Sequence, residues 1–201
     1  NKKKFIYLIS PNRISKNFLR DLTSILKTNR VGIFQMRLKK YSLRQKIIIG
    51  KKIKNICEAN KVCFLVNDDP WLAKKLDADG CHLGQNDMKI KEARDILGNK
   101  IIGITCHNSI KLAKIAIKSN PNYLAFGAFN KTKTKKTKYQ ATTKILNEVN
   151  KLTKIPIVAI GGINSNNYKN LLLNKADFLA ISSYIWNNKK YKPKQAIEIL
   201  R

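Results

Sequence analysis

The amino-acid sequence predicts an α/β protein that folds as a single-domain (β/α)8 TIM barrel over residues 1–201. Eight short apolar runs alternate with longer amphipathic stretches along the chain, which is the pattern of repeated strand–helix units. The runs are apolar at successive positions, as expected of parallel strands that are covered on both faces. No Gly-x-Gly-x-x-Gly motif follows the first run, which disfavours a dinucleotide-binding fold.

The first predicted strand follows the basic segment Asn1–Lys4, an arrangement also found at the start of signal peptides. Its apolar run is too short for a signal core and breaks at Pro11, so a barrel strand is the better interpretation. The other strands follow at regular intervals. In chain order, the predicted strands are Phe5–Ser10, Gly32–Arg37, Val62–Val66, Gly80–Leu83, Ile101–Thr105, Tyr123–Phe126, Ile157–Ile160 and Phe178–Ser182.

Amphipathic stretches between these strands predict the outer helices. Ser42 and the pair Asn108-Ser109 precede two of them and are plausible N-caps, because their side-chain oxygens can accept from free first-turn amides. Trp71 and Trp186 are expected to cover the barrel. The predicted helices are Lys16–Lys27, Leu43–Ala59, Trp71–Leu76, Lys89–Leu97, Ile110–Lys118, Thr142–Leu152, Asn167–Leu173 and Pro193–Leu200.

The chain is strongly basic, with 41 Lys and Arg residues against 12 Asp and Glu and a formal charge of +29. Such a balance is found in proteins that bind nucleic acids or anionic membranes. Here the basic residues are mostly Lys and occur in every predicted helix, whereas Arg is the usual residue for base edges and bidentate phosphate contacts. We therefore interpret the charge as a solvated surface with no nucleic-acid partner.

The composition also indicates a globular protein without a membrane span. Hydrophobic residues make up 43% and charged residues 26%, and no apolar run approaches the roughly 20 residues that cross a bilayer. Four cysteines form no Cys-x-x-Cys pair and have no His at zinc-finger spacing, so we expect reduced, mostly structural thiols (Cys57, Cys63, Cys81 and Cys106). A cytoplasmic protein is expected, and its oligomeric state is left open, a homo-oligomer included.

Cations and carboxylates follow the second, third and fourth predicted strands. In a barrel of this kind the chemistry gathers at the carboxyl ends of the strands. Alternation along the second strand places Gln35, Arg37 and Lys39 on one side. Asp68 and Asp87 follow the next two strands, and two carboxylates on neighbouring strands suit Mg²⁺, which completes its shell with water and phosphate oxygens.

Hydroxyl groups and glycines follow the later strands. Thr105 ends the fifth strand, and the loop after the sixth offers two hydroxyls and an ammonium. Gly161-Gly162 and Ser182-Ser183 end the last two strands, where barrels commonly hold phosphate on backbone amides. The loop residues are Thr132, Thr134 and Lys135. The set as a whole indicates phosphorylated ligands, and no Ser-His-Asp order or reactive Cys motif indicates covalent catalysis.

Each of these features has a simpler structural interpretation. Asp68 and Asp69 could form a turn before Pro70, a common use of Asp. Arg37 and Lys39 could be a solvated strand end. His82 lies in an apolar strand, where a hydrogen-bonded core histidine is the favoured interpretation.

Six motifs together resemble the thiamine-phosphate synthase family. They are Gln-x-Arg-x-Lys, Asn-Asp, His-x-Gly-Gln-x-Asp, Gly-x-Thr-Cys-His, Thr-x-Thr-Lys and Ile-Gly-Gly-Ile, in this order from the second strand to the seventh. The resemblance covers residues 5–185. It implies a (β/α)8 barrel that joins 4-amino-5-hydroxymethyl-2-methylpyrimidine pyrophosphate to a thiazole phosphate, giving thiamine phosphate and pyrophosphate with Mg²⁺ as cofactor.

The resemblance also implies roles for individual residues. Asp68 and Asp87 would bind Mg²⁺. The thiazole phosphate would be held by Thr132, Thr134, Gly162, Ile181 and Ser182. The pyrimidine pyrophosphate would be held by Gln35, Arg37, Lys39, Asn67, Thr105 and Lys135, of which Arg37, Lys39, Thr105 and Lys135 would assist catalysis.

The chain departs from the family pattern at a few positions. Asp69 stands where the family usually has Arg, and Thr105 where it commonly has Ser. Asn130 and Lys131 replace an aromatic residue and a proline, and Ser10 stands where the first strand commonly ends in Asp. These changes put catalytic efficiency in doubt more than the reaction itself.

Two other functions stay open at the level of the sequence. A related thiazole tautomerase shares the barrel but has a His directly after the Gly that ends the sixth strand, where this chain has Ala128. The other alternative is a degenerate basic barrel that binds a ligand or nucleic acid.

Overall fold

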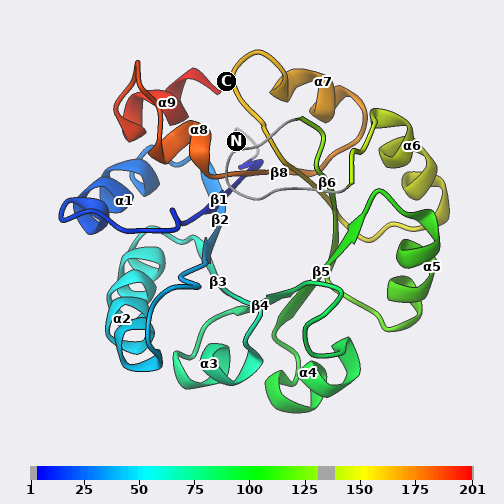
Figure 1. The fold of residues 1–201 in the computed structure, drawn as a ribbon, viewed down its shortest axis with the longest axis horizontal. Helices are drawn as coiled ribbons and strands as arrows, with labels where there is room; N and C mark the ends of the chain where they lie inside the picture. The colour runs from blue at the N-terminus through cyan, green and yellow to red at the C-terminus, as the bar shows by residue number, and fades with distance from the viewer. Residues whose placement is uncertain (1–3, 131–138, 201) are drawn as a thin grey trace.

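In a computed structural model that describes residues 4–130 and 139–200, the chain forms a closed barrel of eight parallel strands (Figure 1). Each strand pairs with its neighbours in chain order, and the eighth closes against the first. The predicted fold class is confirmed. The strands are β1 (Ile6–Ile9), β2 (Val31–Met36), β3 (Cys63–Asn67), β4 (Gly80–Leu83), β5 (Ile101–His107), β6 (Tyr123–Gly127), β7 (Ile157–Ile160) and β8 (Phe178–Ile181).

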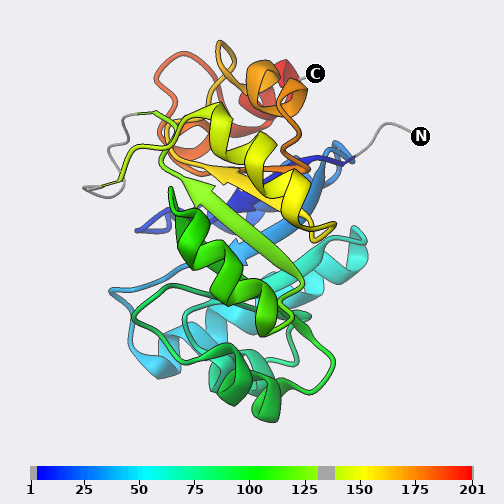
Figure 2. The same cartoon turned by 90° about the vertical axis from the view of Figure 1, so that its right-hand side faces the viewer.

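Helices surround the barrel and run along the outer side of the strands, as Figure 2 shows for α5 and α6 beside β6. The one helix that was not predicted is the short α8. The helices are α1 (Phe18–Leu26), α2 (Leu43–Ala59), α3 (Pro70–Lys75), α4 (Ile90–Leu97), α5 (Ile110–Lys118), α6 (Thr143–Leu152), α7 (Tyr168–Leu173), α8 (Ser183–Trp186) and α9 (Pro193–Ile199).

The strands bury two separate layers of side chains because successive residues point to opposite faces. On β1, Ile6 and Leu8 pack outward beneath the helices, in the larger core. Tyr7 and Ile9 point into the barrel, where they meet inward-facing residues of four other strands. That inner layer is small and carries two phenol groups, since it consists of Tyr7, Ile9, Leu65, Tyr123, Ala125, Val158 and Ala180.

Side-chain caps begin several helices where the sequence indicated them. Ser42 Oγ accepts a hydrogen bond from the Gln45 backbone N–H, and Gln45 Oε1 accepts one from Ser42 N, which completes a capping box. Of the pair Asn108-Ser109, it is Ser109 that caps α5. Asp69 caps α3 by accepting from Leu72 N at 2.9 Å, so its role is structural, as a helix cap rather than as part of a turn.

The two tryptophans differ in their surroundings. Trp186 packs against Phe18 and donates from Nε1 to the Ile9 carbonyl oxygen at 2.7 Å, so it covers the barrel as expected. Trp71 is 60% exposed, and the expectation that it covers the barrel is wrong. Trp71 lies at the start of α3, and Lys74 on the same helix lies over its ring.

The cysteines are free thiols packed among apolar side chains. Burial raises the pKa of Cys63, Cys81 and Cys106 to about 12, and it raises that of Cys57 as well. All four therefore stay protonated at neutral pH and act as small hydrophobic residues.

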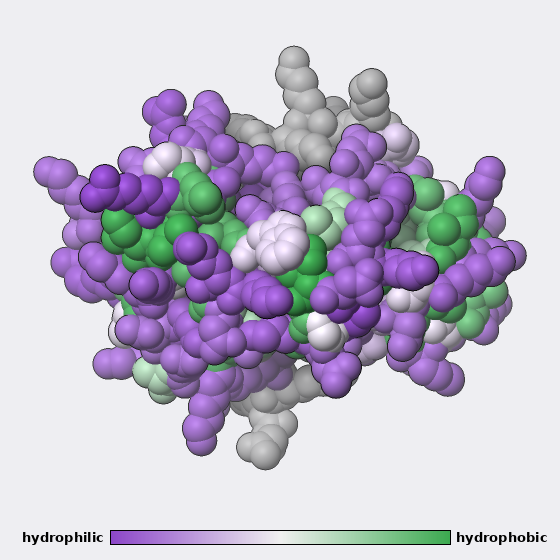
Figure 3. All heavy atoms as spheres, turned by 90° about the horizontal axis from the view of Figure 1, so that it is seen from below, coloured by the Kyte–Doolittle hydropathy of each residue, from purple (hydrophilic) through white to green (hydrophobic). Residues whose placement is uncertain are grey.

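The outer surface is mostly hydrophilic. Figure 3 shows this for the face over α2, α3 and α4, where hydrophobic patches are small and separated by polar side chains. Within the described ranges, no helix has both the length and the apolar character needed to cross a membrane.

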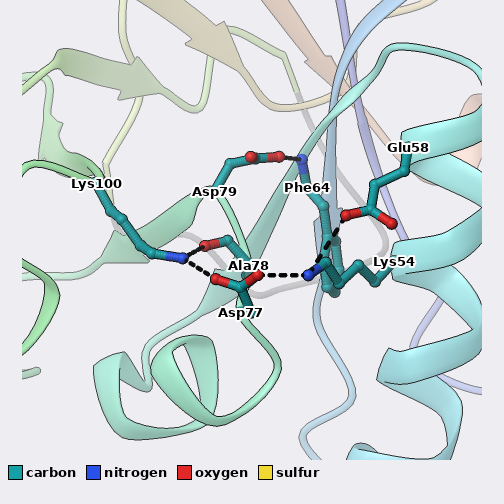
Figure 4. Close-up of polar contacts among 7 residues, drawn as sticks. All are labelled: Lys54, Glu58, Phe64, Asp77, Ala78, Asp79 and Lys100. Carbon is teal, nitrogen blue, oxygen red and sulfur yellow. Dashed lines mark hydrogen bonds and ion pairs between the residues drawn. The ribbon is translucent and has the colours of Figure 1, made fainter.

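An ion-pair cluster lies at the amino-terminal end of the barrel, where α3 leads into β4 (Figure 4). The Asp77 carboxylate accepts from Lys54 Nζ at 2.7 Å and from Lys100 Nζ at 2.6 Å. Lys100 Nζ also donates to the Ala78 carbonyl oxygen, and the Asp79 carboxylate accepts from Phe64 N at 2.6 Å. These contacts tie α2 and the starts of β3, β4 and β5 together.

The D77N variant should lose stability in a way that depends on pH and salt. Hydrogen bonds from Lys100 and Lys54 lower the pKa of Asp77 to about 2, below the value of about 3.9 in unfolded chains. The stabilisation is therefore complete above the unfolded pKa and disappears as the pH falls towards 2. Urea unfolding of both proteins should show a difference at pH 6 that shrinks at low pH and at high salt.

Asp95→Asn provides the matched control, because Asp95 lies on the exposed side of α4 and forms no ion pair within the described ranges. A stability difference for D77N that stayed constant from pH 6 to pH 2 would contradict the ion-pair explanation.

Candidate active site

A cavity of about 700 Å³ opens at the carboxyl ends of the strands, and every strand contributes to its wall. The predicted site residues that the structure describes all line this cavity, although they come from distant parts of the chain. They are Gln35, Arg37, Lys39, Asn67, Asp68, Asp87, Thr105, Gly162, Ile181 and Ser182. The closed barrel explains this, because it brings all the strand ends to one rim.

Arg37 and Lys39 form the cationic side of the cavity. The Arg37 side chain donates from Nη1 to Asn12 Oδ1 at 2.8 Å. Its pKa is lowered by burial, while the nearby Asp68 carboxylate acts in the opposite direction. Lys39 Nζ lies 2.7 Å from Asp68 Oδ2. Two positive charges thus face the cavity beside a carboxylate.

Asp68 and Asp87 bring two carboxyl groups within hydrogen-bonding reach of each other. Burial alone would raise the pKa of Asp68, but the Lys39 ammonium outweighs it and holds the pKa below the usual value. For Asp87, burial and the contact with Asp68 raise the pKa, against the hydrogen bond that its Oδ2 accepts from Gly84 N at 2.7 Å. Two ionised carboxylates at this distance repel each other unless they share a proton or a cation.

The backbone of Asp68 is held in an unusual conformation. Its φ of 65° lies in the left-handed region, at the carboxyl end of β3. Asp tolerates this region better than most residues, yet the conformation costs about 1–3 kcal/mol. Such residues cluster at functional sites, and here the conformation belongs to one of the paired carboxylates.

The residues present fit a Mg²⁺ ion between Asp68 and Asp87. The two carboxyl groups meet at one point of the cavity wall, which is the arrangement that a divalent cation relieves. No group of three or more His, Cys, Asp or Glu side chains that could hold a metal occurs within residues 4–130 and 139–200. Two carboxylates with the rest of the shell left to water and phosphate suit Mg²⁺, whereas zinc takes more protein ligands.

A chain of hydrogen bonds crosses the cavity floor, with each link 2.8 Å long. Gln35 Nε2 donates to Tyr7 Oη, and Tyr7 Oη contacts Tyr123 Oη. Tyr123 Oη contacts His82 Nδ1, and His82 Nε2 contacts Thr105 Oγ1. His82 is thus a hydrogen-bonded histidine, as interpreted from the sequence, and its removal from water lowers its pKa to about 4. The imidazole is neutral at pH 7.

The ends of β7 and β8 form the opposite side of the cavity. Gly161 and Gly162 have φ values of 105° and 62°, which favour glycine, and a Cβ on Gly161 would lie 2.4 Å from Ala128 Cβ. The Gly162 backbone N–H donates to no residue that the structure describes. Ser182 Oγ donates to the Ser10 carbonyl oxygen at 3.2 Å. The Gly162 amide is therefore available here for an anion, and the Ser182 hydroxyl can donate to one by exchanging its hydrogen bond to Ser10.

Thr132, Thr134 and Lys135 lie outside the described residues, in the segment 131–138. The residues on either side of that segment meet at the cavity: Ala128 N donates to the Tyr139 carbonyl oxygen at 3.2 Å. Ala128 and Tyr139 both line the cavity.

Several cavity residues escaped the sequence interpretation. Tyr7 lies in an apolar strand, where the sequence indicates a core residue. Gln85 donates to the Thr105 carbonyl oxygen, and Tyr139 stacks on His107 with 4.3 Å between ring centroids. Ser10 joins β1 to β2 by accepting from Arg37 N at 2.8 Å. Its position at the end of the first strand was the available signal, since strand ends carry the site in barrels.

Comparison with known proteins gives consistent results. The family model described as thiamine monophosphate synthase matches residues 6–185. A thiamine-phosphate synthase of Pelagibacter ubique (strain HTCC1062) is 63% identical over 200 residues, which cover 99% of this chain and 97% of the relative. One of Erythrobacter litoralis (strain HTCC2594) is 41% identical, covering 95% and 92%. The solved thiamine phosphate pyrophosphorylase of Pyrococcus furiosus superposes with a TM-score of 0.88 at 31% identity, covering 99% and 94%.

Proposed function

Since the chain belongs to the thiamine-phosphate synthase family and is an enzyme that makes thiamine phosphate, we propose how its cavity performs the reaction. The pyrimidine pyrophosphate binds between the ends of β2 and β5 with Mg²⁺. The thiazole phosphate binds at the ends of β7 and β8. One observation carries this division: the two cations and the paired carboxylates line one side of the cavity, and the Gly-Gly turn and Ser182 line the other.

Asp68 and Asp87 would hold the Mg²⁺ ion in this proposal. An ion held by these two residues would supply charge neutralisation for the pyrophosphate, which makes pyrophosphate a better leaving group. The support is the contact between the two carboxyl groups and the raised pKa of Asp87. Lys39 Nζ lies 2.7 Å from Asp68 Oδ2. From there it can donate hydrogen bonds to the same phosphate oxygens.

The proposed reaction is a dissociative substitution. The bond between the pyrimidine methylene carbon and the pyrophosphate oxygen breaks, and its electron pair leaves with the pyrophosphate. The thiazole nitrogen then donates its lone pair to the pyrimidinylmethyl cation. Arg37, Lys39 and Lys135 balance the charge of the leaving group, Asn67 and Thr105 orient it, and Gln35 holds the pyrimidine, so no strong base is needed.

The thiazole phosphate does not react, so its contacts serve binding. We assign them to Thr132, Thr134, Gly162, Ile181 and Ser182. The tautomerase alternative is disfavoured, because Ala128 occupies the cavity wall directly after Gly127 and offers no imidazole.

Incubation with the two phosphorylated precursors and Mg²⁺ tests the proposal directly. Thiamine phosphate and pyrophosphate should form in equal amounts, detected by mass, and neither should form when the thiazole phosphate is left out. Conversion of the thiazole phosphate alone to an isomer would favour the tautomerase instead.

Ser182→Ala should raise the KM for the thiazole phosphate by about tenfold to a hundredfold and change kcat little. A hydrogen bond to a charged oxygen contributes about 1.5–3 kcal/mol, and contacts to a group that does not react are similar in the ground and transition states. Steady-state kinetics with each substrate varied in turn measures this. Ser119→Ala is the matched control, because Ser119 ends α5 far from the cavity. A rise in KM for the pyrimidine substrate only would place the two phosphates the wrong way round.

We also propose that the high positive charge has no nucleic-acid partner, because the basic residues are mostly Lys and are spread along the whole chain. A salt titration of binding to random duplex DNA tests this. A steep salt dependence with submicromolar affinity at physiological salt would contradict it.

A further inference from the structure

The hydrogen-bond chain on the cavity floor links two side chains on opposite sides of the barrel. We call this chain the floor network, and it consists of Gln35, Tyr7, Tyr123, His82 and Thr105. It crosses the barrel from β2 through β1, β6 and β4 to β5. The two end residues, Gln35 and Thr105, both belong to the set assigned above to the pyrimidine pyrophosphate.

Three members of the floor network are shielded from solvent, whereas His82 and Thr105 are half-buried. Tyr7 is 1% exposed, Gln35 2% and Tyr123 3%. The Tyr123 ring stacks on His82 at 5.6 Å and meets Tyr7 edge-on at 5.8 Å between centroids. Each buried polar group therefore depends on its neighbour in the network, because none is placed to exchange that partner freely for water.

Given that the buried hydroxyl hydrogens find their acceptors within the floor network, the direction of each remaining hydrogen bond follows from the first one. The Gln35 amide nitrogen can only donate, so Tyr7 Oη accepts from it. The Tyr7 hydroxyl hydrogen is then left for Tyr123 Oη. Tyr123, having accepted from Tyr7, donates its own hydrogen to His82 Nδ1.

The same reasoning determines the tautomer of His82. A neutral imidazole that accepts at Nδ1 carries its hydrogen on Nε2. His82 Nε2 therefore donates to Thr105 Oγ1. The hydroxyl hydrogen of Thr105 is then free to point into the cavity that Thr105 lines.

We infer that the floor network is a one-way hydrogen-bond relay that fixes Gln35 as an acceptor, through Oε1, and Thr105 as a donor toward the pyrimidine pyrophosphate. The polarity of the two ends is coupled across the barrel. Turning the Gln35 amide over would reverse each bond in sequence and leave Thr105 as an acceptor. Tyr123 does not line the cavity, so it acts as a positioning residue through its neighbours.

The relay has a chemical consequence for recognition. An aminopyrimidine offers an amino group that donates, and a pyrophosphate offers oxygens that only accept. An acceptor at Gln35 and a donor at Thr105 match these two parts, whereas the reversed relay would mismatch both. This inference rests on the proposed pyrimidine-side assignment of Gln35 and Thr105.

The tautomer of His82 can be measured without any substrate. The chain has two histidines, so nitrogen-labelled histidine gives two pairs of ring-nitrogen signals, and the His82→Gln variant assigns one pair to His82. We expect His82 to carry its hydrogen on Nε2 in the free protein. A hydrogen on Nδ1 would overturn the relay direction, whatever the enzyme's activity.

Tyr123→Phe tests the positioning role. It removes the central hydroxyl and keeps the ring, and kcat/KM for the pyrimidine pyrophosphate should fall by about tenfold. The KM for the thiazole phosphate should stay within about twofold of its value in the wild-type enzyme. Tyr184→Phe is the matched control and should leave both values unchanged, because the buried Tyr184 Oη has no hydrogen-bond partner in the described part of the chain.

A double-mutant cycle separates positioning from general loss of structure. In a Thr105→Val background, Tyr123→Phe should lower kcat/KM by a smaller factor than in the wild-type enzyme, because one of the two groups that it orients is already gone. Additive losses, or equal losses for both substrates, would overturn the positioning role. If the His82 tautomer is as expected but kinetics are additive, the relay direction holds and the assignment of Thr105 to the substrate fails.

Discussion

Replacing Asp68 or Asp87 with Asn should lower kcat by at least about 100-fold. Each substitution removes a charge from the proposed Mg²⁺ site, and the charge balance on a departing pyrophosphate accounts for several kcal/mol of transition-state stabilisation; about 1.4 kcal/mol corresponds to a factor of ten. Stability should respond differently. Asp87→Asn relieves the contact between two carboxyl groups, so without metal the variant should unfold at the same or a higher urea concentration than the wild type.

Asp69→Asn is the control for both variants. Asp69 is the adjacent residue, it caps α3, and it does not line the cavity. Asn is an equally good N-cap, so activity and stability should stay close to those of the wild type. Full activity of the Asp68 and Asp87 variants in the presence of EDTA would rule out the metal assignment.

The second large effect concerns stability: Gly80→Ala should lower the free energy of unfolding by about 3 kcal/mol, near the upper end for overpacked cores. A Cβ at Gly80 would lie 1.9 Å from the Ile101 carbonyl oxygen and 2.6 Å from its carbonyl carbon. These are backbone atoms of β5, with which Gly80 is paired. The two strands would have to separate, because no side-chain rotation can relieve the contact.

Gly50→Ala is a matched control for this prediction. A Cβ there would meet the Leu76 side chain, with Cδ1 at 2.5 Å. Leu76 can change rotamer at a cost of about 0.5–1.5 kcal/mol, while Ala in the interior of α2 gains about 1 kcal/mol over Gly. Urea unfolding should therefore place this variant within about 1 kcal/mol of the wild type. Equal losses for the two variants would show that contact with backbone is not the cause.

The strands could be predicted from the sequence because each is a short apolar run between longer stretches, and most helices because they are long enough to show a helical period. The eight strand–helix units gave the closed barrel, with strand ends shifted by one or two residues. The helix that was missed, Ser183–Trp186, has four residues, which is too few for a helical period to appear. β5 extends to His107 because a shift in its register with β6 lets it continue past Thr105.

The candidate site could likewise be predicted only in part. The predicted polar residues could be placed on one rim because they lie at, or shortly after, the ends of apolar strands: Gln35, Arg37, Lys39, Asp68 and Asp87. The floor network could not be predicted. Tyr7 and Tyr123 are separated by 116 residues along the chain, and alternation shows that each points inward without showing that they meet.

The ion-pair cluster around Asp77 and the cavity lie at opposite ends of the barrel. Enzymes often lose activity when they are made more stable, because the same residues serve both properties. In this chain the contacts of Asp77, Lys54 and Lys100 can be strengthened or exchanged without touching a cavity residue. Adaptation to a new temperature can therefore proceed at one end of the molecule while selection on substrate turnover acts at the other.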